Sequence, residues 1–564
     1  MKPPSGSGGG LGSRTGALER LAHSATDPLD LLVVGGGITG AGIALDAVSR
    51  GMTVGLVERN DFASGTSSKS SKLVHGGLRY LEQREFGLVR EASTERELLG
   101  RLAPHLVQPF PFVIPISDRW LRAKFGVGLW AYDALATFKN LKAHRYIDRE
   151  ETETLVPPLP RNKMRGGFMF YDSKTDDVRL VMEVLIQARR YGATVCNYTL
   201  VRDLEGSEDV CSALVEDTLT GQVFEMRARR IIAATGVWTD RLESLAKNGA
   251  PPRLRPSKGV HLVFNRAKIP MAEAAAFIPD AERKRMLFVI PWLGSVVIGT
   301  TDTTFHGEID HPSVDDEDRR YCLDAVNSAF KLDLSPSDIS GAYAGLRPLI
   351  SGEAGETADL SRRHAVYDIA PGITGITGGK LTTYRRMAKD AVNRVAEDLE
   401  VDAKPRTGWI RLGSSDLDAL RAAMGRRAKH LGVSDSSLES LIRSYGDRAL
   451  AVLDLAVKDS HTESLSEGFA PIAAEAAYCV RYEMATHLGD LLARRTRLSL
   501  TDPAAGIGAG ALALDLMSEE LGWDRAECNR QRDAYRLEIE RERGTRLGDS
   551  PRPEAHAPGG ARTG

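Results

Sequence analysis

The sequence is poor in cysteine, in long hydrophobic runs and in net charge, and each shortage excludes a class of protein. The cysteines are Cys196, Cys211, Cys322, Cys479 and Cys528, with no C-x-x-C pair among them. Such a scattered set favours reduced thiols in the cytoplasm over a disulfide framework or a metal site. The formal net charge of -2 gives no field that would attract nucleic acid. No apolar run is long enough to cross a bilayer.

What the sequence does have is a glycine-rich unit near its start, from Asp30 to Tyr80. Short apolar runs at 31–34 and 52–57 predict two buried parallel strands, and 38–50 predicts a helix between them. Three glycines follow the first strand in G-x-G-x-x-G spacing: Gly35, Gly37 and Gly40. They permit a tight turn, the approach of a pyrophosphate to the backbone, and close packing of the helix on the strand. Glu58 ends the second strand, where a carboxylate can accept hydrogen bonds from a ribose.

Three later stretches are candidates for the same cofactor. The polar run ASGTSSKSSKLVHGG, residues 63–77, favours loop or helix-cap conformations whose hydroxyls and N–H groups could line it, with a solvated loop as the alternative. An apolar strand ends in the A-T-G of 234–236, a second glycine turn. The turn GITGITGGKLTTY, residues 372–384, precedes a predicted helix over 382–399. The positive end of that helix suits the negative charge that develops on a reduced flavin.

The two ends of the chain differ from its middle. The 564 residues are enough for two or three domains. Residues 1–26 begin with a glycine- and serine-rich run and predict a flexible leader. The spacing of apolar residues over about 416–547 predicts helices, and the Pro- and Gly-rich tail 549–564 predicts disorder.

Short β-like runs fill the middle of the chain. Between 260 and 349 they predict an antiparallel sheet, which 365–369 continues. Residues 110–116 form another such run, with Pro111 and Pro115 near its margins. Because proline cannot donate to a sheet ladder, this run predicts an edge strand.

Motifs along most of the chain resemble those of one enzyme family. They are GGGITGAGIALDA, SGTSSKSSKLVHGGLRYLE, FGLVREA, SKGVHLV, FVIPW, IGTTDT, AGLRPL and GGKLTTYR, in this order from about residue 30 to 390. The C-terminal EAAYCVRYEMATHLGDLLARRTR continues the match. By these motifs the chain resembles the FAD-dependent, aerobic-type glycerol-3-phosphate dehydrogenases, which are part of the wider group of glycine-oxidase-like flavoproteins.

The resemblance implies an α/β fold with three parts. An FAD-binding Rossmann-type (glycine-oxidase-like) domain would be joined to an antiparallel-sheet substrate domain and a C-terminal α-helical domain. The oxidoreductase region is expected over 27–400 and the helical domain over 405–548. Within the first region, the FAD-binding segments are expected at about 28–100, 165–245 and 365–400, and the substrate-binding segments at about 101–164 and 246–364.

The implied cofactor is FAD, bound without a covalent link because no His or Cys attachment motif is in view. No metal is expected. The matched motifs assign cofactor contacts to Gly35, Gly36, Gly37, Ile38, Thr39, Gly40, Glu58, Thr66, Ser67, Ser68, Lys72, Leu73, His75, Gly76, Gly77, Ala234, Thr235, Gly236, Gly379, Lys380, Leu381 and Thr382.

The implied reaction is oxidation of sn-glycerol 3-phosphate at C2 to dihydroxyacetone phosphate. Hydride passes to flavin N5 and electrons go on to a quinone, in glycerol or glycerophospholipid catabolism. One alternative is an oxidase that passes electrons to oxygen. A second alternative is a nicotinamide-dependent dehydrogenase, which the A-T-G strand disfavours. A third is a non-catalytic flavin-binding regulator, which would have no use for the basic residues Arg79, Arg347 and Lys380.

The reaction needs cations for the phosphate and a base for the hydroxyl proton. The family's motifs assign substrate contacts to Arg79, Tyr80, Arg347, Arg362 and Lys380, with Arg347 as the main phosphate clamp. A structural arginine paired with a buried carboxylate is the alternative for Arg347. Two histidines compete for the base, His75 and His261, because imidazole titrates near neutral pH. The sequence slightly favours His261 and gives His75 a flavin or substrate contact.

A basic, Trp-bearing segment, residues 119–145, has two interpretations. It resembles an interfacial amphipathic helix that would dock the protein on the inner face of the cell membrane, where the quinone lies. A helix packed inside the substrate domain with a solvated basic face is the equal alternative. A homodimer is left open.

Overall fold

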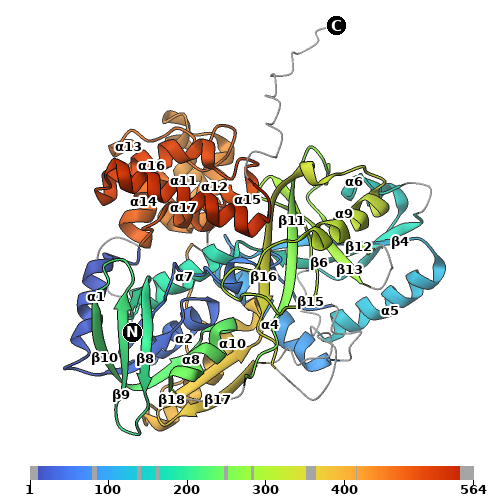
Figure 1. Cartoon of the computed structure of the whole chain (residues 1–564). Helices are drawn as coiled ribbons and strands as arrows, with labels where there is room; N and C mark the ends of the chain where they lie inside the picture. The colour runs from blue at the N-terminus through green and yellow to red at the C-terminus, as the bar shows by residue number, and fades with distance from the viewer. Residues whose placement is uncertain are drawn as a thin grey trace.

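The computed structural model describes residues 10–78, 85–135, 142–160, 164–246, 252–280, 285–350, 364–414 and 416–546. Two large sheets lie side by side, and C-terminal helices cover one side of the junction between them (Figure 1). Each sheet has its own hydrophobic core, and the C-terminal helices contain two more.

The first sheet has a parallel centre. Its strands are β1 (Leu29–Val34), β2 (Val54–Val57), β7 (Thr194–Cys196), β8 (Thr199–Glu205), β9 (Cys211–Asp217), β10 (Val223–Ala233), β17 (His364–Ala370) and β18 (Ile373–Gly378). Strand β1 pairs in parallel with both β2 and β10. Its last four residues are fully buried, as parallel strands covered on both faces require. The predicted strand–helix–strand unit is therefore present at the centre of this sheet.

Helices α2 (Ile38–Ser49), α7 (Asp177–Arg190) and α10 (Tyr384–Asp398) pack together in the core of this first sheet. The turn from β1 into α2 depends on two glycines. Gly35 has a φ of 115°, and a Cβ on Gly40 would lie 1.8 Å from the carbonyl oxygen of Gly35. No larger residue fits either position, so the glycine spacing sets the close approach of helix and strand.

The second sheet is largely antiparallel. Its strands are β3 (Leu73–Val74), β4 (Gln108–Ile116), β5 (Arg145–Ile147), β6 (Gly166–Lys174), β11 (Ser257–Asn265), β12 (Ala275–Pro279), β13 (Met286–Trp292), β14 (Ser295–Gly299), β15 (Thr303–Thr304) and β16 (Ile339–Arg347). Helices α4 (Phe86–Leu102), α5 (Arg119–Leu135), α6 (Arg149–Leu155) and α9 (Asp316–Phe330) accompany it. The predicted antiparallel sheet is confirmed.

Two predictions about strands are wrong. Strand β4 is not at an edge but lies between β6 and β12. Its prolines are tolerated because the ladder to β12 is confined to Phe112 and Val113. Residues 365–369 belong to β17, which pairs with β18 in the first sheet and does not continue the second.

The flexible leader is also corrected for the residues described. Helix α1 (Arg14–His23) is capped by Ser13 and buries Ala17 and Leu21, and Leu11 before it is buried as well. The side chain of Arg14 donates to the carbonyl oxygens of Asn197 and Tyr198. The sequence signal missed this helix because a glycine-rich run precedes it and only a narrow apolar face marks it.

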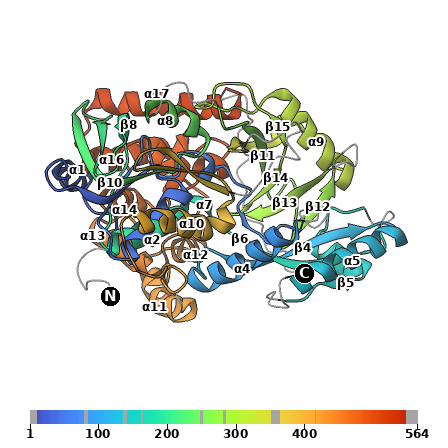
Figure 2. The ribbon, with the colours of Figure 1, turned by 90° about the horizontal axis from the view of Figure 1, so that it is seen from below.

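The C-terminal part is helical, as predicted. Its helices are α11 (Leu417–His430), α12 (Asp435–Tyr445), α13 (Ala449–Lys458), α14 (Ala474–Glu483), α15 (Leu498–Thr501), α16 (Ile507–Leu521) and α17 (Arg525–Arg543). A π-helical turn, Asp490–Arg495, precedes α15. Helices α15 and α17 contact β16, and Figure 2 shows α17 running along one side of the molecule. In the described chain no helix is long and apolar enough to cross a membrane.

Candidate active site

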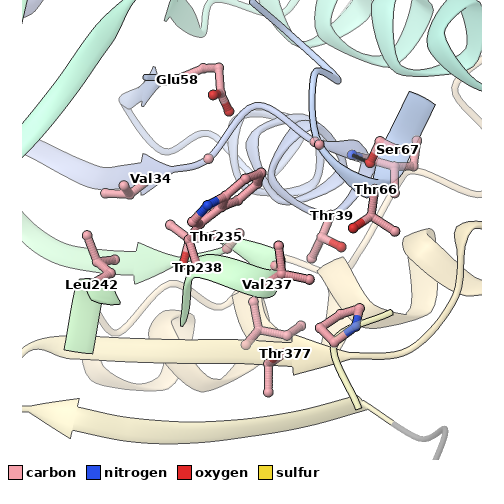
Figure 3. Close-up of a pocket in the computed structure, with 18 of the residues that line it drawn as sticks. Val34, Thr39, Glu58, Thr66, Ser67, Thr235, Val237, Trp238, Leu242 and Thr377 are labelled. Atoms are coloured by element: carbon pink, nitrogen blue, oxygen red, sulfur yellow. Dashed lines mark hydrogen bonds between the residues drawn. The ribbon is translucent and has the colours of Figure 1, made fainter. Parts of the chain in front are cut away.

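A cavity opens at the carboxyl ends of the parallel strands of the first sheet, where such sheets bind ligands. Many of the predicted cofactor residues line it: Gly35, Gly37, Ile38, Thr39, Glu58, Thr66, Ser67, Ala234, Thr235, Gly236, Gly379, Lys380 and Leu381. Figure 3 shows Thr39, Thr66 and Ser67 near one end of the cavity and Trp238 across its middle. Stretches that are far apart in sequence therefore meet around one space.

Two hydrogen bonds help to fix the part of the polar loop after β2 that faces the cavity. The N–H of Ile38, at the start of α2, donates to Ser67 Oγ at 3.0 Å. The hydroxyl of Thr66 donates to the carbonyl oxygen of Leu346 at 2.6 Å, and so ties the loop to β16. Residues 63–67 of the loop form part of the cavity wall, and its contact with FAD stays a prediction.

Glu58 lies at the carboxyl end of β2 and is held by the backbone. Its Oε2 accepts the N–H of Gly36 at 2.6 Å and its Oε1 that of Asn60 at 2.9 Å. Burial raises the pKa of this carboxyl, although both hydrogen bonds lower it. Each carboxylate oxygen has a second lone pair, so the fixed side chain retains acceptors for ribose hydroxyls.

Two hydroxyl groups of the cavity lining are suited to bind a polar ligand. In the described residues, the hydroxyls of Thr235 and Thr377 are buried and have no hydrogen-bond partner, and both side chains line the cavity. Gly236 has a φ of 58° and open space where a Cβ would point. Unpaired buried hydroxyls are costly, so these features fit a bound dinucleotide.

The other predicted cofactor residues lie outside the cavity lining. These residues are Gly36, Gly40, Ser68, Lys72, Leu73, His75, Gly76, Gly77 and Thr382. The ammonium of Lys72 is fully buried and donates to both oxygens of Asp177, at 2.9 and 3.0 Å. Burial lowers the pKa of Lys72 to about 8 despite Asp177. The N–H of Gly76 donates to Asp172, and that of His75 to Thr382 Oγ1 at 3.2 Å.

Arg347 is the last residue of β16 and is held by the turn that follows β14. Its Nη1 donates to Asp302 Oδ1 at 3.2 Å and its Nη2 to Thr300 Oγ1 at 3.0 Å. The Asp302 side chain is 3% exposed and that of Arg347 is 28% exposed. The guanidinium is thus fixed by a buried carboxylate while part of it stays accessible.

The two candidate bases have different surroundings. His261 is almost fully buried, stacks on Tyr343 and shares a hydrogen bond of 2.8 Å with Ser71 Oγ. Burial, with Arg347 and Lys72 adding to it, lowers the pKa of His261 to about 3. His75 is only partly buried and adjoins the 380–382 turn that borders the cavity. Arg79, Tyr80 and Arg362 lie outside the described residues.

Several lining residues were missed by sequence reasoning: Thr199, Leu200, Val201, Val237, Trp238, Arg241, Leu242, Leu245, Thr377 and Met387. Trp238 is the most prominent of these. Its indole N–H donates to Asp310 Oδ1 at 2.6 Å, and the guanidinium of Arg59 lies 4.4 Å from the ring centroid. Trp238 follows the A-T-G turn by two residues, and this position was the signal that could have found it.

This fold and this site define an FAD-dependent oxidoreductase. The family model for FAD-dependent oxidoreductases matches residues 30–385, and the model for the C-terminal domain of alpha-glycerophosphate oxidase matches residues 409–528. With both models in this order, the chain belongs to the FAD-dependent glycerol-3-phosphate dehydrogenase family. Its cofactor is FAD.

Relatives agree over nearly the whole length. Glycerol-3-phosphate dehydrogenase 2 of Mycobacterium tuberculosis is 41% identical over 542 residues, which are 94% of this chain and 91% of that protein. Aerobic glycerol-3-phosphate dehydrogenase of Bacillus subtilis is 36% identical and covers 89% of this chain and 93% of its own. The glycerol-3-phosphate dehydrogenase structure from Bacillus halodurans, complexed with FAD, has a TM-score of 0.79 and 30% identity, and covers 95% of this chain and 98% of its own.

Proposed function

We propose that this protein oxidises sn-glycerol 3-phosphate at C2 to dihydroxyacetone phosphate and passes the electrons to a membrane quinone. The observation that supports the proposal is the fixed position of Arg347 at the end of β16. Thr66, in the polar loop that lines the cavity, binds the same strand at Leu346. When bound, FAD supplies the hydride acceptor. The protein's own residues then have to bind the phosphate, orient C2 and remove the hydroxyl proton.

Arg347 binds the phosphate of the substrate in this proposal. Asp302 and Thr300 fix the plane of its guanidinium, so that a phosphate meets a fork that is already oriented. The same contacts fit a purely structural arginine, and substrate choice separates the two roles. Lys380, at the cavity edge, adds positive charge near the cofactor turn. Arg79, Tyr80 and Arg362 remain predicted substrate contacts.

The hydroxyl proton is the task of His75. Protonating His261 would place a cation in a fully buried site that Arg347 and Lys72 already make positive, and its pKa of about 3 reflects that cost. His75 is accessible and adjoins the cavity. Because His261 is buried, we now favour His75 over His261 as the base, opposite to the preference drawn from the sequence. We propose that His261 instead stabilises the site by stacking on Tyr343.

Helix α5 is the proposed membrane contact. Trp120, Val127 and Trp130 are 69%, 71% and 63% exposed and recur at helical spacing along one face. Arg119 and Arg122 are exposed beside them. A stripe of tryptophan with flanking cations suits an anionic lipid surface, and α5 lies at the end of the molecule away from α1 (Figures 1 and 2).

The electron acceptor is tested by comparing quinone and oxygen. Purified holoenzyme given sn-glycerol 3-phosphate should reduce a soluble quinone analogue rapidly while it releases little peroxide in air. Peroxide formation at the full rate of substrate oxidation would make the protein an oxidase instead.

The oligomeric state is a separate question, because the sequence left a homodimer open. Light scattering of the same preparation tests whether that homodimer forms.

A further inference from the structure

The cofactor loop, residues 61–72, is anchored at both of its ends by buried charges. Its middle lines the cavity, and Thr66 binds β16 next to Arg347. Asp61 at its start and Lys72 at its end are both 0% exposed. Phe62 and Ala63 near its start are buried in the core of the first sheet, but the polar residues that follow have little apolar surface to hold them. We therefore expect the two charged anchors to help set the position of the cavity wall.

The first anchor binds the C-terminal helical part. Arg495 donates to both oxygens of Asp61, Nη1 to Oδ2 at 2.8 Å and Nη2 to Oδ1 at 2.9 Å. Arg494 Nε donates to Oδ2 of the same carboxylate at 2.7 Å. Both arginines come from the π-helical turn Asp490–Arg495, whose wide turn brings two consecutive side chains to one carboxylate. π-Helical turns are frequent at functional sites.

The second anchor runs through Asp177 at the start of α7. Lys72 Nζ and the hydroxyl and N–H of Ser70 all donate to Asp177. Arg497 binds Asp177 from the other side and reaches Asp176 at 2.9 Å. Although burial opposes its charge, Lys72 and Arg497 lower the pKa of Asp177 to about 2, so this network is ionised at neutral pH.

We propose that the C-terminal helical domain controls FAD retention by holding both ends of loop 61–72 through Arg494, Arg495 and Arg497. These arginines are positioning residues, because they line no part of the cavity and act through Asp61 and Asp177. The inference rests on FAD binding and not on the identity of the substrate or acceptor. Loosening the arginines should release FAD before the protein unfolds.

Arg495→Lys tests the first anchor, because lysine keeps the charge but cannot form the two parallel hydrogen bonds of the guanidinium. Arg494→Gln is the second variant, in case Arg495→Lys does not fold. We expect the FAD dissociation constant to rise about tenfold or more, as for one lost charge-assisted hydrogen bond. Flavin fluorescence should report release of FAD at a temperature below that at which circular dichroism reports unfolding.

Arg448→Lys is the matched control. Arg448 also joins the C-terminal helices to α7 through a buried ion pair, with Glu183 at 2.6 Å, but neither residue belongs to the loop. This variant should lower the unfolding temperature and leave the FAD dissociation constant unchanged. An unchanged FAD dissociation constant in both Arg495→Lys and Arg494→Gln would overturn the proposal. Equal weakening of FAD binding in Arg448→Lys would overturn it as well, since any interdomain pair would then do the same.

Discussion

Arg347 is the residue on which the substrate assignment depends. A phosphate must be held so that C2 meets the cofactor, and a misplacement of about 1 Å can cost roughly 10²-fold in rate. The buried carboxylate of Asp302, 3.2 Å from Nη1, fixes the guanidinium before substrate arrives. Lysine would supply charge without direction.

Arg347→Ala should therefore lose affinity for sn-glycerol 3-phosphate by about 1.5–3 kcal/mol, seen as a higher KM in steady-state kinetics. Arg347→Lys should bind the phosphate but turn over slowly. Unphosphorylated glycerol at high concentration is the control substrate, and its weak turnover should change little. Equal losses on both substrates, or early melting with loss of flavin, would assign Arg347 a structural role.

Variants of His75 and His261 distinguish which of the two histidines is the general base. His75→Asn should slow flavin reduction about 10²–10⁴-fold, the range for loss of a general base. The rate constant is measured by anaerobic stopped-flow bleaching as a function of pH, and the rise of rate with pH should disappear. His261→Asn should keep a pH-dependent rate, since the buried ring is neutral above its pKa of about 3. The reverse pattern would restore His261 as the base.

Many residues of the cavity lining could be predicted from the sequence, but the direction of the long side chains around it could not. Glycine spacing, Glu58 and the A-T-G turn mark the cavity wall because backbone geometry requires those residues. Lys72 carries the same kind of motif signal, yet its ammonium turns inward to Asp177. The direction of a long side chain depends on a carboxylate that is 105 residues away in the chain, and no local pattern reports it.

At the scale of elements, α5 carries the membrane prediction. Its inner face is buried through Leu129 and Tyr132, and Phe125 packs on the same cluster. The exposed side chains can therefore be changed without disturbing the fold. Replacing Trp120, Val127 and Trp130 together by Ser should release the protein from anionic vesicles, measured by co-sedimentation, and leave activity with a soluble dye intact.

Trp409→Ser is the control for that experiment, because Trp409 is 88% exposed but lies in the linker before α11. It should bind vesicles like the unaltered protein. If the α5 triple variant still sediments with vesicles, α5 is not the docking element.

Elements with a strong period were predictable, and those set by distant pairing were not. The helix expected over 382–399 is α10, because its buried residues recur at helical spacing. The prolines of β4 suggested an edge strand, but they sit in the middle of the sheet where β12 pairs with two residues only. The number of β4 residues that pair with β12 depends on the tertiary structure. The prolines in the sequence therefore could not show that β4 lies inside the sheet.

For the whole molecule, buried neutral histidines predict how stability depends on pH. Burial lowers the pKa of His105 to about 4 and that of His261 to about 3. The unfolded chain, with histidine pKa values near 6.5, therefore binds more protons below that pH. The unfolding free energy should fall as the pH falls from about 6.5 to 4, by about 1.4 kcal/mol per pH unit for each histidine.

His105→Gln isolates one of these contributions. Urea unfolding at a fixed FAD concentration should show a shallower fall between pH 6.5 and 4 for the variant than for the parent protein. Identical slopes would mean that His105 is protonated in the folded state, where Glu183 lies 3.9 Å from its Nε2.

The whole molecule is expected to transfer hydride from sn-glycerol 3-phosphate to FAD. The most direct measurement is the absorbance of the yellow holoenzyme near 450 nm without oxygen, as substrate is added. We expect complete bleaching with sn-glycerol 3-phosphate and formation of one dihydroxyacetone phosphate per flavin. Glycerol and the opposite enantiomer should bleach the flavin far more slowly. A flavin that stays oxidised with sn-glycerol 3-phosphate would rule out this reaction.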